Sequence, residues 1–223
     1  ISACLVGSEM CIRDRYKLPI GCDVPETIIL ADGDFPSHPL ALEWLRQCPY
    51  VVCCDGAANT YIRSGRMPEA IVGDGDSLLP DIKERYASLI HSEAEQETND
   101  LSKAFRFCLS QERKRITIMG ATGKREDHTI GNVSLLADYM EQAEVSMVTD
   151  YGIFVPIRED SMFESYIGQQ ISVFNMNSTA LSAEGLAYPL SVFTNWWQGT
   201  LNEALARHFI IRTEGKVLVF RVF

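Results

Sequence analysis

Short apolar runs alternate with amphipathic stretches between about residue 25 and residue 148. Several runs are apolar throughout, which is typical of strands that are covered on both faces. Between them, residues 100–111 and the stretch after Asp127 place apolar side chains at helical spacing. The predicted strands are 27–30, 50–54, 70–72, 89–91, 115–119 and 145–148. Strands that alternate with helices predict a mainly parallel sheet with helices on both faces, a Rossmann-like α/β fold.

The pattern changes after Asp150. Short β-prone runs at 170–174, 208–213 and 216–222 are joined by Gly, Asn, Ser and Pro. The stretch "RTEGKVLVF" predicts a hairpin that turns at Glu214 and Gly215, whereas 201–207 predicts one helical turn. We therefore expect an α/β domain over 25–155 and an all-β domain, a β-sandwich, over 156–223.

The first residues do not fit either domain. The string "ISACLVGSEMCIRDR" has no basic leader and no sustained apolar segment, so it does not have the pattern of a signal peptide. It resembles a translated sequencing-adapter read. Residues 1–24 are therefore expected to be non-native or disordered and to take no part in the fold.

Composition and charge exclude several classes of binding partner. The chain is 46% hydrophobic and 22% charged, as in ordinary globular proteins. Its net charge of −10 argues against nucleic acid and anionic membranes as partners, so a polyanionic ligand would need a metal ion or a local basic cluster. Seven cysteines without a C-x-x-C pair favour a reducing cytoplasm. No apolar run is as long as a membrane span.

Four acidic or glycine-rich segments follow predicted strands. They are "ILADGDF", "VVCCDGAAN", "IVGDGDS" and "ITIMGATGKREDH". Each alone is typical of a helix cap or a polar turn. Ligands of open α/β sheets bind beyond the carboxyl ends of the strands, so four such segments at successive strand ends predict a binding site.

The pair Asp74 and Asp76 is the strongest candidate in these segments. Hard cations such as Mg²⁺ bind carboxylate and phosphate oxygens together, and such an ion would make two neighbouring carboxylates tolerable. Asp100 lies at the start of the predicted helix 100–111, where it either caps the helix or completes the metal site; Asn99 is the favoured cap.

The segment 120–128, "GATGKREDH", predicts phosphate binding. Glycine turns expose backbone N–H groups before a helix, and Arg125 can bind phosphate through two hydrogen bonds. The spacing does not match a P-loop. Asp127 and His128 are expected to orient a hydroxyl or to contact a base, with helix capping as the alternative for Asp127.

Taken together, these motifs resemble the thiamine pyrophosphokinase family. The resemblance rests on "DGAAN", "GDGDS", "QETNDLSKA", "GATGKREDHTIGN" and, in the β domain, "GLAYPL" with "GTLNEA". It implies an α/β nucleotide-binding domain followed by a β-sandwich, in a homodimer with thiamine bound between subunits. It also implies transfer of a diphosphoryl group from Mg·ATP to thiamine, with release of AMP.

The resemblance also implies roles for individual residues. It implies metal binding by Asp74, Asp76 and Asp100, and catalysis by these three together with Asp127. The implied cofactor-binding and substrate-binding residues of the α/β domain are Asp55, Asn59, Gln96, Lys103, Arg125 and His128. In the β domain, Tyr188 matches an aromatic position stacked on thiamine, and Thr200 and Asn202 match a polar pair.

The expected reaction is attack of a hydroxyl on the β-phosphorus of Mg·ATP. Either Asp127 or Asp100 accepts the hydroxyl proton, and the sequence leaves both open. Two alternatives are a diphosphokinase of similar fold that acts on a pterin alcohol, and a sensor that binds nucleotide or thiamine without catalysis.

Overall fold

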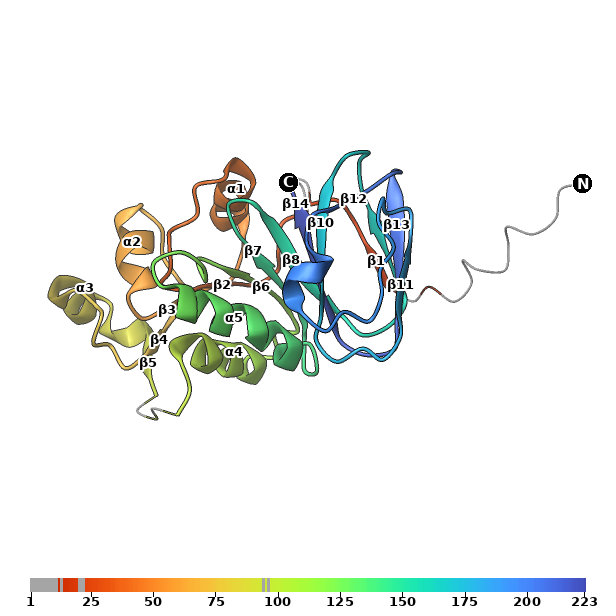
Figure 1. The fold of residues 1–223 in the computed structure, drawn as a ribbon. Coiled ribbons are helices and arrows are strands. Elements are labelled where there is room, and N and C mark those ends of the chain that lie inside the picture. The colour runs from red at the N-terminus through yellow and green to blue at the C-terminus, as the bar shows by residue number, and fades with distance from the viewer. Residues whose placement is uncertain (1–11, 13, 20–22, 94, 96) are drawn as a thin grey trace, which may run out of the picture. The chain divides into compact units, whose positions relative to one another are not determined.

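The computed structural model describes residues 12, 14–19, 23–93, 95 and 97–223. The chain forms two compact units (Figure 1). The first is Ile20–Tyr151, and the second combines Gly152–Phe223 with the N-terminal segment. The division between Tyr151 and Gly152 lies next to Asp150, after which the pattern of the sequence changes.

The first unit is built on a parallel sheet with strand order β7-β6-β2-β3-β4-β5. Its core strands are buried along their whole length, as their continuous apolar sequences predict. The strands are β2 (Ile28–Leu30), β3 (Val51–Cys54), β4 (Ala70–Gly73), β5 (Ile90–Ser92), β6 (Arg115–Met119) and β7 (Glu144–Val148).

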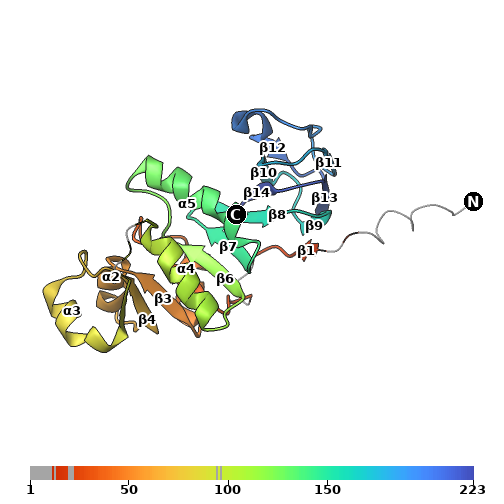
Figure 2. The same cartoon turned by 90° about the horizontal axis from the view of Figure 1, so that it is seen from below.

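Helices cover this sheet. They are α1 (Pro39–Gln47), α2 (Ala57–Arg63), α3 (Pro80–Arg85), α4 (Asp100–Ser110) and α5 (Glu126–Tyr139), with a short 3₁₀ turn, η2, at Ala87–Leu89. Helix α4 packs on β2, β3 and β4, α5 packs on β7, and α2 packs on β3. Figure 2 shows α4 and α5 in front of the strands, and Figure 1 shows α1 and α2 on the other side. The fold is thus of the mixed α/β class.

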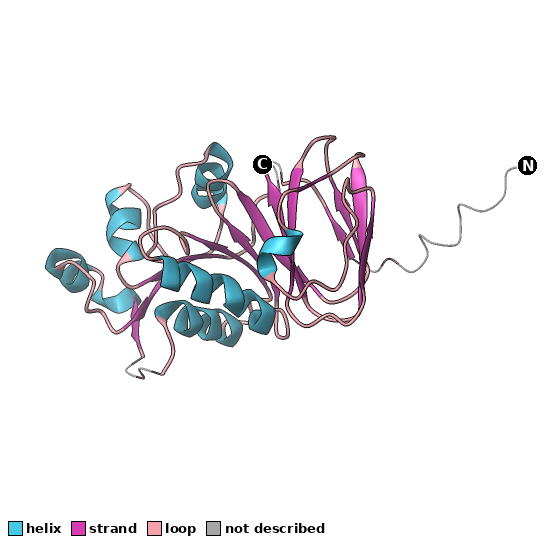
Figure 3. Ribbon diagram, in the orientation of Figure 1, coloured by secondary structure: helices cyan, strands magenta, loops and turns pink. Residues whose placement is uncertain are grey.

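The second unit consists almost entirely of strands (Figure 3), in two sheets of order β12-β10-β14-β8 and β1-β9-β13-β11. The strands are β1 (Asp14–Tyr16), β8 (Gly152–Ile157), β9 (Ser161–Glu164), β10 (Gln170–Asn175), β11 (Leu181–Glu184), β12 (Asn202–Glu203), β13 (His208–Thr213) and β14 (Val217–Val222). A 3₁₀ turn, η3, spans Trp196–Gly199.

The predicted hairpin at Glu214 and Gly215 is wrong. Strand β13 pairs with β9 and β11, whereas β14 pairs with β8 and β10, so the two strands belong to different sheets. Each strand buries its own apolar side chains, such as Phe209 and Val219. The turn at Gly215, with φ of +136°, therefore carries the chain from one sheet to the other.

The helical turn predicted over 201–207 is also wrong. Asn202–Glu203 forms β12, and Ala204 pairs with Leu186 in an isolated bridge. Leu201 has a φ of +63°, a left-handed conformation that a right-handed helix cannot contain.

Part of the segment expected to lie outside the fold forms a strand. Asp14–Tyr16 pairs in parallel with β9, and the Tyr16 ring stacks on Phe163 at a centroid distance of 4.7 Å. The buried Arg221 donates a hydrogen bond to the Lys17 carbonyl at 3.0 Å. Without β1, β9 would be the edge of its sheet and would leave backbone groups unpaired, so three residues with little pattern of their own can join it.

Among the helices in the described part of the chain, none is long and apolar enough to cross a bilayer.

Candidate active site

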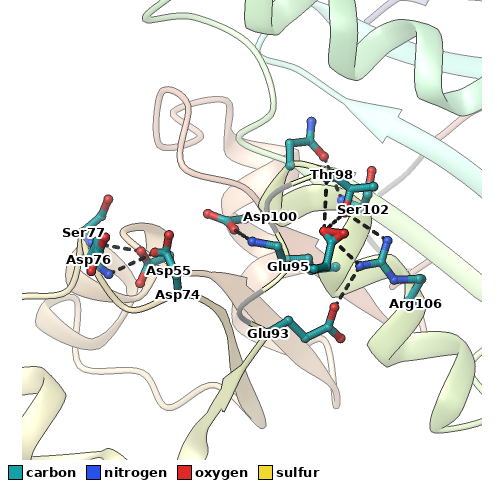
Figure 4. Close-up of polar contacts among 12 residues, drawn as sticks. Asp55, Asp74, Asp76, Ser77, Glu93, Glu95, Thr98, Asp100, Ser102 and Arg106 are labelled. Atoms are coloured by element: carbon teal, nitrogen blue, oxygen red, sulfur yellow. Dashed lines mark hydrogen bonds and ion pairs between the residues drawn. The ribbon is translucent and has the colours of Figure 1, made fainter.

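Three acidic residues gather where the parallel strands β3 and β4 end. Asp55 follows β3, Asp74 follows β4, and Asp100 lies in the first turn of α4. The carboxyl ends of parallel strands share one edge of a sheet, so these segments meet there. Figure 4 shows Asp55 and Asp74 close together and the Asp100 carboxylate directed toward them. We call Asp55, Asp74 and Asp100 the acidic cluster.

Asp55 is the most buried member of the cluster, with 3% of its surface exposed. One carboxylate oxygen, Oδ2, accepts a hydrogen bond from the Ser77 amide at 3.0 Å. The other, Oδ1, is buried and has no hydrogen-bond partner in the described part of the chain. Burial raises the pKa of Asp55, the Ser77 hydrogen bond opposes this shift, and the nearby Asp100 and Asp74 carboxylates raise the pKa further.

The loop after β4 places Asp74 beside Asp55. The Asp74 Oδ1 atom accepts a hydrogen bond from the Asp76 amide at 3.1 Å, which closes a tight turn. Gly75 has a φ of +78°, and its carbonyl accepts a hydrogen bond from Lys83 Nζ at 2.9 Å. The Asp76 side chain is exposed.

Asn59 braces this loop from α2. Its side-chain nitrogen donates to the Ser77 carbonyl at 2.8 Å, and its oxygen accepts from the Leu79 amide at 3.0 Å. Both ends of the amide therefore contact the protein. The expected contact of Asn59 with nucleotide or thiamine stays a prediction.

Asn99 caps helix α4, as predicted, because its side chain accepts a hydrogen bond from the Ser102 amide at 2.9 Å. Asp100 is thereby free to face the cluster. A methyl group added at Gly73 would lie 2.8 Å from the Asp55 Cβ and 3.4 Å from the Asp100 Cγ. Glycine at position 73 therefore leaves the space into which both acidic side chains approach.

Lys103 supplies a positive charge at the cluster. It lies one helical turn after Asp100, and its Nζ atom is 3.2 Å from the Asp100 Oδ1. Only 4% of the Lys103 side chain is exposed.

Of the three predicted metal ligands, two lie in the acidic cluster and the third, Asp76, has an exposed side chain. Asp74 and Asp100 lie in the acidic cluster together with Asp55, which the sequence assigned to nucleotide or thiamine contacts instead. Among the described residues, no three acidic, histidine or cysteine side chains stand in an arrangement ready to hold a metal ion. The ligand set Asp74, Asp76 and Asp100 stays a prediction.

At the start of α5, Arg125 and Asp127 pair with each other. Their two hydrogen bonds, Nε to Oδ1 and Nη2 to Oδ2, measure 3.1 and 2.6 Å. This pairing lowers the pKa of Asp127 to about 2. The helix begins at Glu126, so Asp127 lies in its first turn and is not the capping residue. His128 is exposed, and its amide donates to Asp127.

The loops after β2 and β6 interlock at the same edge. The Gly33 amide donates to the Gly120 carbonyl at 2.6 Å, and the Asp34 amide donates to the Thr122 carbonyl at 2.9 Å. Lys124 Nζ lies 3.0 Å from an Asp32 carboxylate oxygen. Sequence reasoning named "ILADGDF" as a strand-end segment but missed that Asp32 positions Lys124.

In the second unit, the three predicted substrate-binding residues line one pocket of about 310 Å³. The side chain of Asn202 accepts from the Tyr188 amide at 3.0 Å and donates to the Tyr188 carbonyl at 2.8 Å. The Tyr188 residue is 64% exposed, and the Thr200 hydroxyl donates to the Trp197 carbonyl. Gln96, expected near the thiamine ring, lies outside the described residues. The complete lining is Tyr188, Pro189, Phe193, Gln198, Gly199, Thr200, Leu201 and Asn202.

Fold and site define a class of protein: a mixed α/β unit with acidic and glycine-rich loops at the carboxyl edge of a parallel sheet, followed by a β unit with an aromatic-lined pocket. Two family models match the chain. "Thiamin pyrophosphokinase, catalytic domain" matches residues 41–149, and "Thiamin pyrophosphokinase, substrate-binding domain" matches residues 152–220. The chain belongs to the thiamin pyrophosphokinase family.

Curated relatives are similar over part of their length. Thiamine pyrophosphokinase 1 of Oryza sativa subsp. japonica is 30% identical over 129 residues, which cover 47% of this chain and 49% of the relative. Thiamin pyrophosphokinase 1 of Caenorhabditis elegans is 31% identical over 110 residues, or 45% of each chain. The matched part thus spans about half the length of these relatives.

Solved structures are similar over nearly the whole chain. Thiamin pyrophosphokinase from Candida albicans has a TM-score of 0.77 at 18% identity and covers 94% of this chain and 93% of its own. Thiamine pyrophosphokinase from Bacillus subtilis has a TM-score of 0.73 at 20% identity, with coverages of 88% and 98%. At these identities the likeness shows a shared fold.

Proposed function

We propose that the protein is a thiamine diphosphokinase, which transfers a diphosphoryl group from Mg·ATP to the hydroxyl of thiamine and releases AMP. The observation that carries the proposal is the acidic cluster, with its unpartnered Asp55 oxygen, at the edge of the sheet where ligands of α/β proteins bind. Membership of the family supports it.

The cluster offers oxygen donors suited to a divalent metal ion, which would have to draw them closer together than they stand in the described residues. The buried Asp55 Oδ1 lacks a partner, Gly73 leaves a space that a Cβ would fill, and the available donors are carboxylate oxygens, which Mg²⁺ prefers. Asp74, Asp76 and Asp100 are the proposed ligands, and Asp55 adds a fourth carboxylate beside them. A bound ion would supply positive charge that offsets the charge of the phosphate oxygens.

The side chains of the protein would contribute by positioning the phosphates and the attacking hydroxyl. Phosphoryl transfer depends mainly on orientation and charge neutralisation. Arg125 would contact phosphate oxygens, for which it must exchange its present partner, Asp127. While it is paired with Arg125, Asp127 has a pKa of about 2 and is a weak base, but it is released when Arg125 turns to the phosphates. We propose that either Asp127 or Asp100 accepts the hydroxyl proton.

We propose that the second unit binds thiamine. Thiamine carries a cationic ring, and the exposed Tyr188 ring offers a face on which a cation can stack. Thr200 and Asn202 supply polar groups in the same pocket. We further propose a homodimer in which this pocket faces the partner subunit, so that thiamine binds between the subunits.

We also propose a role for each unit of the fold. The first unit would act as a Rossmann-like domain for ATP and metal, and the second as a β-sandwich for thiamine. A cytoplasmic location is consistent with the free thiols of Cys48, Cys53, Cys54 and Cys108.

AMP formation from ATP, with and without thiamine and at two Mg²⁺ concentrations, tests the function. We expect AMP only when thiamine and Mg²⁺ are both present. Replacing thiamine by a pterin alcohol tests the alternative that the protein is a diphosphokinase for pterin alcohols. No observation on the described residues favours this alternative. Tight binding of ATP and thiamine without any AMP would instead indicate a sensor.

The variant Asp74→Ala tests the role of the cluster in turnover. We expect kcat to fall by at least about 100-fold, because charge neutralisation at the phosphates is lost, while the melting temperature is retained. Asp138→Ala, which removes an exposed carboxylate from α5, is the matched control. Normal turnover of Asp74→Ala would remove the metal site from the proposal.

A further inference from the structure

Lys103 is an unusual lysine because it is buried in the first unit. It lies on α4 among the buried side chains of Leu101, Ala104 and Phe105, and 4% of its own side chain is exposed. Burying an ammonium group costs several kcal/mol unless an opposite charge accompanies it. The Asp100 carboxylate, 3.2 Å away, is that charge.

Asp100 is in turn part of a cluster that carries more negative than positive charge. Asp55, Asp74 and Asp100 bring three carboxylates together, and Lys103 brings one ammonium. Lys103 therefore offsets one of the three carboxylates of the cluster, and the exposed Asp76, a further proposed ligand, adds negative charge beside it.

We propose that Lys103 is the resident counter-ion of the acidic cluster: it holds Asp100 in place and lowers the negative charge that a bound cation meets. Lys103 is then a positioning residue and does not itself contact the nucleotide. The inference rests on the proposed function only in taking the cluster as the metal site.

The neighbouring lysines differ from Lys103 in their contacts. Lys83 is exposed and donates to a backbone carbonyl, that of Gly75. Lys124 pairs with Asp32, which is outside the cluster as defined. Lys103 therefore combines burial with a direct contact to a cluster carboxylate, as a fixed counter-ion requires.

Metal binding measured without nucleotide distinguishes a counter-ion from a nucleotide ligand. In Lys103→Met the cluster gains one unbalanced negative charge, so Mn²⁺ observed by electron paramagnetic resonance should bind about tenfold more tightly, the size expected for one added unit charge near the ion. Lys103→Arg keeps the charge and should stay near the wild-type affinity. Lys114→Met removes an exposed lysine before β6 and should leave the affinity unchanged.

Thermal denaturation supplies the second readout. In EDTA we expect Lys103→Met to melt below wild type, and Mg²⁺ to raise its melting temperature more than it raises that of wild type. The double variant Lys103→Met/Asp100→Asn removes both charges and should regain part of the loss. This variant also keeps the test informative if Lys103→Met does not fold.

Two results would overturn the inference. One is an unchanged Mn²⁺ affinity in Lys103→Met; weaker binding of ATP by this variant, measured by titration calorimetry, would then make Lys103 a nucleotide ligand. The other is a double variant no more stable than Lys103→Met, or unfolded like it. Neither readout needs thiamine or turnover, so the inference can fail while AMP is still formed, and the proposed function can fail while Lys103 still acts as the counter-ion of the cluster.

Discussion

At the scale of single residues, Asp55 is a carboxyl group whose burial and acidic neighbours both disfavour its charged form. Its pKa is raised by burial first and then by Asp100 and Asp74, and one of its oxygens has no partner among the described residues. The sequence indicated an acidic group after β3 but not this raised pKa, because the distance between Asp55 and Asp100 is set by the packing of α4 against β3 and β4.

The variant Asp55→Asn should stabilise the metal-free protein. Because its pKa is raised, folded Asp55 keeps its proton to higher pH than unfolded Asp55 does. The contribution of Asp55 to the free energy of unfolding is therefore most favourable below the ordinary pKa, and it is lost as pH rises through the raised pKa. Asparagine carries no charge at any of these pH values, so the variant does not lose this stability. We expect the melting temperature at pH 7 in EDTA to rise by about 2–4 °C, as for roughly 1 kcal/mol.

Calorimetry at pH 4 and pH 7, with and without Mg²⁺, checks this expectation. The gain should be smaller at pH 4, and Mg²⁺ should stabilise Asp55→Asn less than wild type. Asp138→Asn serves as control, since that carboxylate is exposed. A lower melting temperature for Asp55→Asn in EDTA would contradict the electrostatic account of the cluster.

Asp127 presents the opposite case. Its pKa is held at about 2 by the hydrogen bonds from Arg125. A lowered pKa favours the folded state above the ordinary value, and this contribution is lost as pH falls through the lowered pKa. Carboxyl ¹³C NMR should show Asp127 titrating near 2 in wild type and near its ordinary value in Arg125→Gln. An unchanged titration in Arg125→Gln would mean that the ion pair does not form in solution.

At the scale of elements, the sequence predicted the buried strands well and the connections less well. Strands β6 and β13 have the predicted bounds, because β6 is followed by Gly120 and β13 by Glu214 and Gly215, where the chain turns. The hairpin after β13 was predicted wrongly, since pairing partners depend on which sheet buries each face. The left-handed backbone at Leu201 could not be predicted either, because leucine does not favour it.

The interlocked loops after β2 and β6 yield an element-scale prediction. A Cβ at Gly123 would lie 2.1 Å from the Asp34 Oδ2, and the backbone there has a φ of +78°. Gly123→Ala should therefore destabilise the first unit by about 1–3 kcal/mol. Gly131→Ala is the matched control: it lies in α5 with open space around it and should be neutral or stabilising by up to about 1 kcal/mol. Urea denaturation measures both, and equal stabilities would refute the interlock.

At the scale of the whole molecule, the chain joins a unit with an acidic cluster to a unit with an aromatic pocket. The change of pattern near residue 150 predicted two domains, whereas the contribution of Asp14–Tyr16 to the second unit could not be predicted. That strand has no apolar alternation. It is held by backbone pairing with β9 and by the buried Arg221, which lies far along the chain.

This division predicts that variants of the two units affect different kinetic constants. Tyr188→Ala should raise the KM for thiamine by about tenfold, through the loss of cation–π stacking, while Mn²⁺ binding at the cluster stays unchanged. Tyr151→Ala, another exposed tyrosine, should have no effect on either quantity. A Tyr188→Ala enzyme with an unaltered KM for thiamine would place the thiamine site elsewhere.

The identity of the products tests the central claim most directly. ³¹P NMR of ATP, thiamine and Mg²⁺ incubated with the protein should show AMP and thiamine diphosphate appearing in equal amounts, because the β- and γ-phosphoryl groups move together. Formation of ADP with thiamine monophosphate, or no AMP above a thiamine-free control, would contradict the account.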